Sequence, residues 1–148
     1  MNDRNTQQSE IDKISEWREW LRYAEMDYDC ASYLNEMPLH PRPYEIICYH
    51  CQQTAEKAIK ALIVSLGSQG GMPKVHNISF LINQIKDQLK DTKGIIIEES
   101  LYDAADFLTP YGIVPRYPSE MEFSDLETNE ALNDAKTILE WVKAVLIV

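Results

Sequence analysis

Cysteine and glycine are scarce in this 148-residue chain, and their scarcity excludes several kinds of site. The three cysteines, Cys30, Cys48 and Cys51, are too few and too clustered for a disulfide framework. The glycine-containing segment at 67–71, GSQGG, lacks the Lys-Ser/Thr pair that a P-loop requires. No apolar run approaches the ~20 residues that a transmembrane helix needs. The sequence therefore predicts neither a disulfide-stabilised protein nor a membrane-spanning one.

Basic residues are also in short supply. The chain has 14 Lys and Arg against 24 Asp and Glu, which gives a formal charge of −10 and a pI near 4.7. Affinity for a nucleic-acid backbone comes largely from Lys and Arg that displace counterions, so general nucleic-acid binding is not expected. A local basic pocket for a nucleotide is compatible with this charge. The polar start MNDRNTQQSE lacks the apolar core of a secretory signal, and we expect a cytoplasmic protein.

Apolar residues recur at steps of three and four along most of the chain, which predicts helices. We expect a disordered N-terminal tail at 1–9, Ser9 as the first N-cap, and a capping box of Ser124 and Glu127 before the last helix. The expected helices cover about 10–36, 43–66, the segment beginning near 78, 96–108 and 125–145. Prolines and glycines separate them.

These elements predict an all-α fold, a compact antiparallel bundle of about five helices. The length is typical of one domain, so residues 10–148 are expected to form a single helical-bundle domain. No internal repeat or low-complexity tract argues for a second unit.

The segment YHCQQTAEKAIKAL at 49–62 reads as helix and carries an unusual number of polar residues. On a helical wheel its small and aliphatic residues gather on one side, which predicts a core-facing surface. His50 lies at the edge of that surface. The opposite side carries Tyr49, Gln53, Glu56, Lys57 and Lys60. Spacing alone favours a solvated face; the alternative is a polar groove shared with another helix or subunit.

Cys48 and Cys51 form a C-x-x-C pair with His50 between them. Zinc would need two further ligands, and nothing in the sequence places Cys30 or His76 beside them. A redox pair would need its first cysteine at a helix start, whereas both cysteines fall inside a helix. We therefore expect buried, inert thiols, with no metal and no cofactor.

Three segments also carry a family resemblance. YHCQQTAEKAIKALI at 49–63 resembles the signature helix of the HEPN family, in which an aromatic residue, a histidine and a glutamine precede Glu-Lys and Lys-Ala. VHNISFLINQI at 75–85 resembles the family's His-Asp-Leu segment, with Asn77 where aspartate is usual, and PRYPSE at 115–120 resembles its Arg-Tyr-Pro loop. The motifs occur in the family's order, and the likeness spans residues 20–142.

The resemblance implies a compact bundle of about five helices, nucleotide binding and a homodimer. It also implies a minimal nucleotidyltransferase as partner in a toxin–antitoxin-like module. We expect the polar side of the central helix and the loop near residue 116 to converge on one cavity. The candidate nucleotide or anion site comprises His50, Gln53, Lys57, Lys60, His76, Arg116 and Tyr117.

Two other functions remain open. The resemblance also covers a branch of metal-independent ribonucleases, which carry an Arg and a His with four to six residues between them. That pair is not found here, because seven residues separate Arg42 from His50, and catalysis is therefore not expected. A non-catalytic helical adaptor is the third interpretation. Trp20 and Tyr23 fall off the core stripe of the first helix, which predicts an exposed aromatic interface.

Overall fold

The computed structural model describes residues 2–67, 74–113 and 123–147. Within these ranges every regular element is a helix, so the predicted all-α fold is confirmed. A short 3-10 helix, η1, follows the fourth α-helix. The elements are α1 (Asn2–Glu36), α2 (Tyr44–Ser65), α3 (Ile78–Lys93), α4 (Glu99–Leu108), η1 (Thr109–Gly112) and α5 (Asp125–Ile147).

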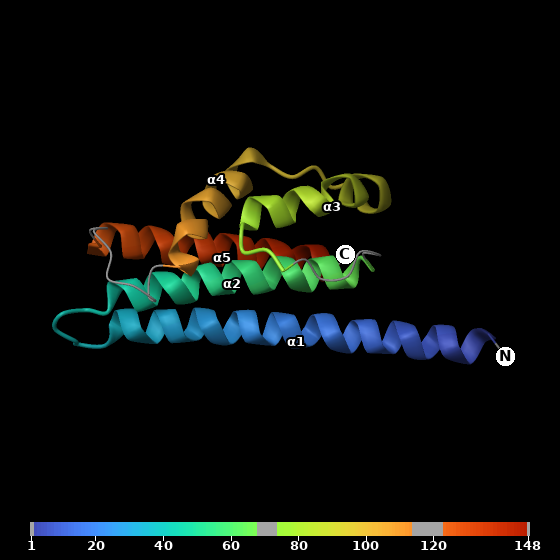
Figure 1. Ribbon diagram of the computed structural model, residues 1–148, viewed down its shortest axis with the longest axis horizontal. Coiled ribbons are helices and arrows are strands. Elements are labelled where there is room, and N and C mark those ends of the chain that lie inside the picture. The colour runs from blue at the N-terminus through green and yellow to red at the C-terminus, as the bar shows by residue number, and fades with distance from the viewer. Residues whose placement is uncertain (1, 68–73, 114–122, 148) are drawn as a thin grey trace.

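Helix α2 is the centre of the bundle (Figure 1). The long helix α1 runs beside it along one edge, α5 packs against it, and α3 and α4 lie on the side away from α1 (Figure 1). Close approach is possible because α1 and α2 present alanines to the core: Ala24, Ala31, Ala55 and Ala58 are fully buried. The polar flank of α2 faces α1 and lies beside the segment that leads into α3.

Local sequence explains several helix ends. The Asn77 side chain caps α3 by accepting a hydrogen bond from the Phe80 backbone N–H at 3.0 Å. Gly94 ends α3 in the left-handed conformation, φ 65°, which glycine adopts without steric cost. At α5 the Ser124 backbone N–H donates to Glu127 Oε2 at 3.0 Å, as the predicted capping box requires.

Two predicted helix starts are wrong. Helix α1 begins at Asn2 and runs through the segment expected to be a disordered tail, so Ser9 lies inside the helix. Residues 2–36 contain neither glycine nor proline to interrupt it. Helix α4 begins at Glu99 instead of about residue 96. Three consecutive isoleucines, 95–97, precede it, and β-branched residues favour the extended backbone.

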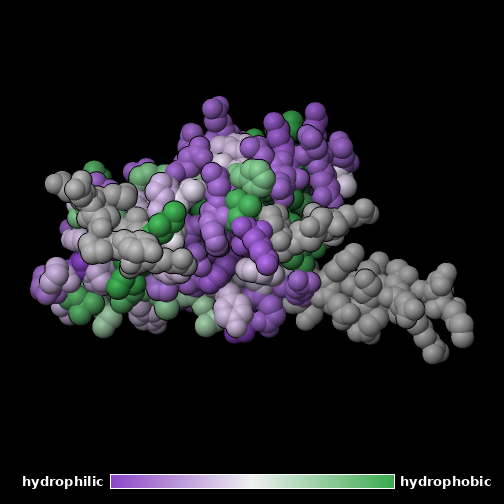
Figure 2. All heavy atoms as spheres, in the orientation of Figure 1, coloured by the Kyte–Doolittle hydropathy of each residue, from purple (hydrophilic) through white to green (hydrophobic). Residues whose placement is uncertain are grey.

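Hydrophilic side chains cover much of the face shown in Figure 2, most densely over α3 and α4. None of the helices in the described ranges has the length and apolar character to cross a membrane.

Asp134 on α5 is a half-buried carboxyl one turn from Glu130. Burial, and secondarily the Glu130 charge, raise the pKa of Asp134 to about 6. The folded state thus holds this proton more tightly than the unfolded chain. The resulting stabilisation is complete below about pH 4 and is lost as the pH rises through about 6.

We therefore expect Asp134→Asn to raise the free energy of unfolding at neutral pH by about 1 kcal/mol. The full shift would correspond to ~3 kcal/mol, reduced here because water screens a half-exposed carboxyl. Urea unfolding at about pH 7.5 and about pH 4 measures this, and the gain should vanish at the lower pH. An equal gain in stability at both pH values would contradict a raised pKa for Asp134.

Candidate functional site

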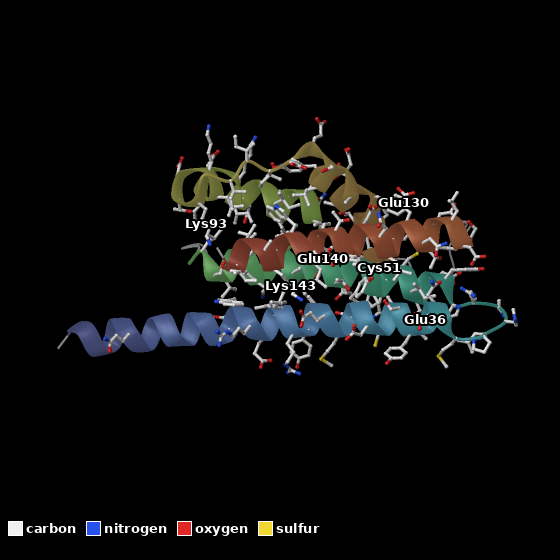
Figure 3. All side chains as sticks on the ribbon, turned by 180° about the vertical axis from the view of Figure 1, so that it is seen from behind. Glu36, Cys51, Lys93, Glu130, Glu140 and Lys143 are labelled. Carbon is white, nitrogen blue, oxygen red and sulfur yellow. The ribbon has the colours of Figure 1, made fainter. Side chains whose placement is uncertain are left out.

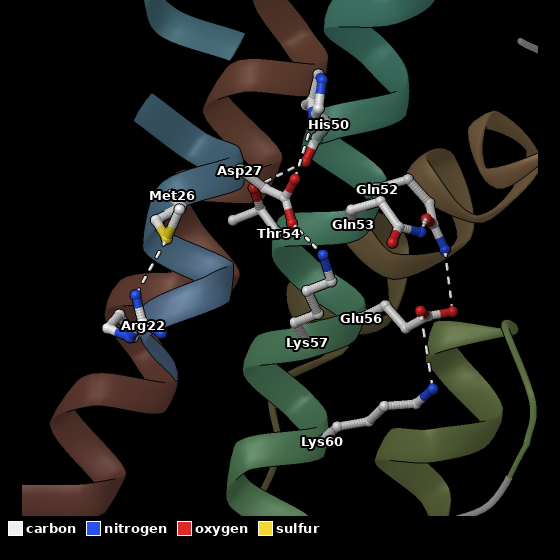
Figure 4. Close-up of polar contacts among 10 residues, drawn as sticks. All are labelled: Arg22, Met26, Asp27, His50, Gln52, Gln53, Thr54, Glu56, Lys57 and Lys60. Atoms are coloured by element: carbon white, nitrogen blue, oxygen red, sulfur yellow. Dashed lines mark hydrogen bonds and ion pairs between the residues drawn. The ribbon is translucent and has the colours of Figure 1, made fainter. Parts of the chain in front are cut away.

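The polar side of α2 is more enclosed than the sequence predicts. Glu56 and Lys60 are only 4% and 7% exposed, so the prediction that they face solvent is wrong. His50, Gln53 and Lys57 are half-buried. Helix α1 and the segment before α3 cover this flank, and buried charges of this kind require partners. Two carboxylates supply them (Figure 4).

The first carboxylate is Asp27 of α1, which binds two α2 side chains and forms with them the Asp27 cluster. Lys57 Nζ donates to Asp27 Oδ2 at 2.6 Å, and His50 Nδ1 lies 2.9 Å from Asp27 Oδ1. An ionised carboxylate only accepts hydrogen bonds, so Nδ1 is the protonated ring nitrogen of His50. Burial raises the pKa of Asp27, but the hydrogen bonds from His50 and Lys57 outweigh it and hold the pKa below its usual value.

The second carboxylate is Glu56, the centre of the Glu56 cluster. Its Oε1 lies 2.7 Å from Nδ1 of His76, a residue of the segment before α3, and its Oε2 lies 3.7 Å from Lys60 Nζ. The Lys60 ammonium also lies 5.6 Å from the ring centroid of Trp20 on α1. The His76 side chain is 73% exposed although its partner is buried, so the ring reaches inward from the surface.

Gln52, fully buried, connects the Glu56 cluster to neighbouring elements. Its Nε2 donates to the His76 carbonyl oxygen at 3.3 Å, and its Oε1 accepts from Gln53 Nε2 at 2.7 Å. A Cβ added at Gly112 of η1 would lie 3.0 Å from the Gln52 amide carbon. Glycine therefore lets η1 approach the buried amide closely.

A cavity of about 380 Å³ lies between α1 and α2 next to the Asp27 cluster. Its volume falls within the ~300–1,000 Å³ typical of small-molecule sites. The Lys57 ammonium is 5.9 Å from the Tyr23 ring centroid at this cavity, and Arg22 pairs with Glu19 at 3.0 Å beside it. The lining is two aromatic rings, two carboxylates and one ammonium: Trp20, Tyr23, Glu16, Glu19 and Lys57.

The fold brings together only some of the residues that the sequence predicts for the nucleotide or anion site. His50 and Lys57 meet at Asp27, Lys60 and His76 meet at Glu56, and Gln53 joins them through Gln52. Arg116 and Tyr117 lie outside the described residues, so the predicted convergence of their loop on this flank stays a prediction. Sequence reasoning missed Asp27 and Gln52 as site residues and took Trp20 only as surface.

Burial suppresses the reactivity of two of the three thiols. Burial, opposed weakly by Thr128, raises the pKa of Cys48 to about 11, and burial raises the pKa of Cys51 well above its ordinary value. Thiols held protonated are poor nucleophiles and poor metal ligands. Cys30 is exposed on α1. In the described part of the chain no three His, Cys, Asp or Glu side chains gather into a metal-binding group.

Comparison with known proteins decides the family. The family model described as HEPN domain matches residues 17–145, which include the Asp27 and Glu56 clusters. The chain belongs to the HEPN family. The resemblance found in the sequence motifs is therefore confirmed.

Relatives support the same assignment. A protein of Methanocaldococcus jannaschii named "Putative toxin MJ1304" is 27% identical over 143 residues, covering 86% of each chain. The crystal structure of ST0689, described as an archaeal HEPN homologue, has a TM-score of 0.64 and 27% identity, covering 88% of this chain and 97% of that one. The crystal structure of TT1696 from Thermus thermophilus has a TM-score of 0.70 and 25% identity, covering 87% and 97%.

The residues nearest to a HEPN ribonuclease pair have separate structural partners. Arg42 Nη1 donates to the Asn35 carbonyl oxygen at 2.8 Å and lies 4.0 Å from Asp125. His50 is held by Asp27 instead. Each side chain thus fastens a different part of the HEPN bundle: Arg42 the turn between α1 and α2, His50 the packing of α1 on α2.

Proposed function

We propose that this HEPN protein is a non-catalytic, cytoplasmic component of a toxin–antitoxin-like module. In that role it binds a nucleotide and works with a minimal nucleotidyltransferase. The observation that carries the nucleotide proposal is the α1–α2 cavity, where the rings of Trp20 and Tyr23 lie beside the Lys57 ammonium. Family membership and the toxin name of one relative support the module.

The lining suggests how a nucleotide would be bound. A base stacks on Trp20 and Tyr23, an interaction worth about 1–3 kcal/mol per base in single-stranded nucleic-acid sites. Glu16 and Glu19 only accept hydrogen bonds, so they favour a base with an exocyclic amino group. Lys57 contributes the positive charge for a phosphate, although Asp27 partly neutralises it. Most of the affinity should therefore come from the base.

A thermal-shift panel of ATP, GTP, CTP and UTP tests the proposal. We expect stabilisation by the nucleotides whose bases carry an amino group, and less by UTP. Trp20→Ala should weaken binding of both ATP and adenosine about tenfold, the loss of one stacked base. Lys57→Met should weaken ATP alone. Arg116→Ala tests the predicted contribution of the 115–120 loop, and we expect it also to weaken ATP.

Nucleotide binding and the protein partner are tested by separate experiments, so either half of the proposal can fail alone. No stabilisation of intact protein by any nucleotide would overturn nucleotide binding and favour the structural adaptor. Co-expression with the protein that the adjacent reading frame encodes tests the partner: we expect that protein to be a minimal nucleotidyltransferase that co-purifies. An adjacent protein of another kind, or one that does not co-purify, would overturn that half alone.

A ribonuclease toxin is the second candidate function. The observation that favours it is the Glu56–His76 pair, in which a buried carboxylate orients an exposed imidazole, as in general acid–base sites. Expression of the protein without a partner, followed by assays of growth and of RNA cleavage, separates the two functions. Growth arrest that His76→Ala abolishes would replace our proposal with catalysis.

A further inference from the structure

His76 combines an exposed imidazole with a buried carboxylate partner. Its side chain is 73% exposed, whereas Glu56, whose Oε1 lies 2.7 Å from His76 Nδ1, is buried. The ionised carboxylate only accepts hydrogen bonds, so in the neutral ring Nδ1 carries the proton and Nε2 carries the lone pair. Because Nδ1 faces the buried carboxylate, Nε2 lies on the solvent side of the ring. The pair therefore presents a nucleophilic nitrogen to solvent in one fixed tautomer.

Two further hydrogen bonds hold the segment that carries this ring. The His76 carbonyl oxygen accepts from Gln52 Nε2 at 3.3 Å. Two residues later, the Ile78 N–H donates to Thr109 Oγ1 of η1 at 3.2 Å. The ring therefore cannot turn away from Glu56 without breaking contacts to α2 or η1. A group that is already held in position loses less freedom when it reacts, and this favours attack by His76.

The other two histidines of the chain each have only one of these two properties. His50 has a carboxylate partner, Asp27, at 2.9 Å, but its side chain is only 25% exposed. His40 is exposed in the turn after α1, and no carboxylate in the described part of the chain pairs with it. Exposure and orientation by a carboxylate occur together at His76 alone.

We propose that His76 Nε2 is a phosphoryl acceptor and that the donor is a small acyl phosphate. Nε2 attacks the phosphorus atom, and the new P–N bond forms as the bond between phosphorus and the acyl oxygen breaks. The leaving group departs as a carboxylate with the electron pair of that bond, so it needs no proton. The ring becomes an imidazolium that keeps its proton on Nδ1, and the Glu56 carboxylate stabilises this positive charge. Glu56 is thus a positioning residue for His76.

The surroundings of the ring favour a small donor. The formal charge of −10 repels a polyanion such as a nucleoside triphosphate more strongly than a small acyl phosphate. His76 directly precedes Asn77, the N-cap of α3, so the phosphoryl group forms beside the positive end of a helix dipole. Helix α3 lies on the opposite side of α2 from α1 (Figure 3), and His76 does not line the α1–α2 cavity. The acceptor site is therefore independent of the proposed nucleotide binding.

Incubation of the intact protein with acetyl phosphate, followed by mass spectrometry of the protein and its peptides, tests the proposal. We expect a single phosphoryl group on His76 that is stable to alkali and lost in acid, as the P–N bond of a phosphohistidine requires. His76→Ala should abolish the labelling, and His40→Ala, the matched control, should be labelled like wild type. No incorporation, or incorporation on a carboxylate, from which alkali removes the group, would overturn the proposal.

The ratio of labelling rates at His76 and His40 within one sample tests the role of Glu56. In wild type His76 should react about tenfold faster or more, because its ring is held in the reactive tautomer. Glu56→Gln, shown to be folded by circular dichroism, should bring the ratio close to one, because an amide carries no charge to stabilise the imidazolium. A wild-type ratio near one would show ordinary reactivity of exposed histidines and would overturn the proposal. A ratio that Glu56→Gln leaves unchanged would overturn the role of Glu56.

Discussion

Replacing Glu56 with alanine should lower the free energy of unfolding by about 3 kcal/mol, the largest loss we expect from a polar substitution. Lys60 is buried, and Glu56 Oε2 lies 3.7 Å from its ammonium. The same carboxylate binds His76, which positions the segment before α3. Its removal leaves a buried positive charge and detaches that segment from α2. Urea unfolding monitored by circular dichroism measures the loss.

An exposed pair of the same spacing provides the control. Lys136 and Glu140 of α5 are 4.0 Å apart and more than half exposed, so Glu140→Ala should cost less than about 0.5 kcal/mol. Replacing both members of the buried pair, Glu56→Met with Lys60→Met, should recover most of the lost stability, because no charge is then left unpaired. A Glu56→Ala variant as stable as Glu140→Ala would show that the buried pair contributes nothing.

Replacing Asp27 with asparagine should cost about 2 kcal/mol at neutral pH, because charge-assisted hydrogen bonds to His50 and Lys57 are lost. Since the folded-state pKa of Asp27 is lowered, this carboxylate stabilises the fold fully above its unfolded pKa of about 3.9, and the contribution disappears as the pH falls through the lower folded value.

The difference between wild type and Asp27→Asn should therefore be largest near pH 6–7 and should shrink steadily below about pH 4. Unfolding measured across this range is the test. Asp134→Asn provides the opposite pH dependence in the same protein, because the pKa of Asp134 is raised. A difference for Asp27→Asn that grows on acidification would contradict the assigned direction.

The helices were predictable because their signals are local. The apolar period of α3 and the Ser124–Glu127 pair both act within a few residues, and each is found as the sequence indicates. The start of α1 was missed because a polar helical segment has no apolar period to reveal it.

The site was predictable only in part, because its contacts join distant segments. Spacing identified His50, Lys57 and Lys60 as polar residues of α2, but it does not say what covers them. Asp27 offered a signal: it lies between Ala24 and Ala31 on the buried side of α1, where a carboxylate requires a cationic partner. Gln52, three residues before Ala55, offered a related signal, because a buried side-chain amide requires hydrogen-bond partners.

Pairing of these cations changes the kind of ligand that the flank can bind. Lys57 shares the charge of Asp27, and Lys60 that of Glu56, so neither is a free positive charge for a phosphate. Together with the net charge of −10, this makes strong phosphate affinity unexpected. What the α1–α2 cavity offers instead is aromatic surface, which is the reason for placing the base there.

The indole signals of the three tryptophans test this central claim most directly. In a ¹⁵N-labelled protein titrated with ATP, we predict that the Trp20 indole resonance moves progressively and saturates, while that of Trp141, on α5, stays in place. A titration that leaves the Trp20 indole unmoved, whether or not ATP binds elsewhere, would contradict nucleotide binding between α1 and α2.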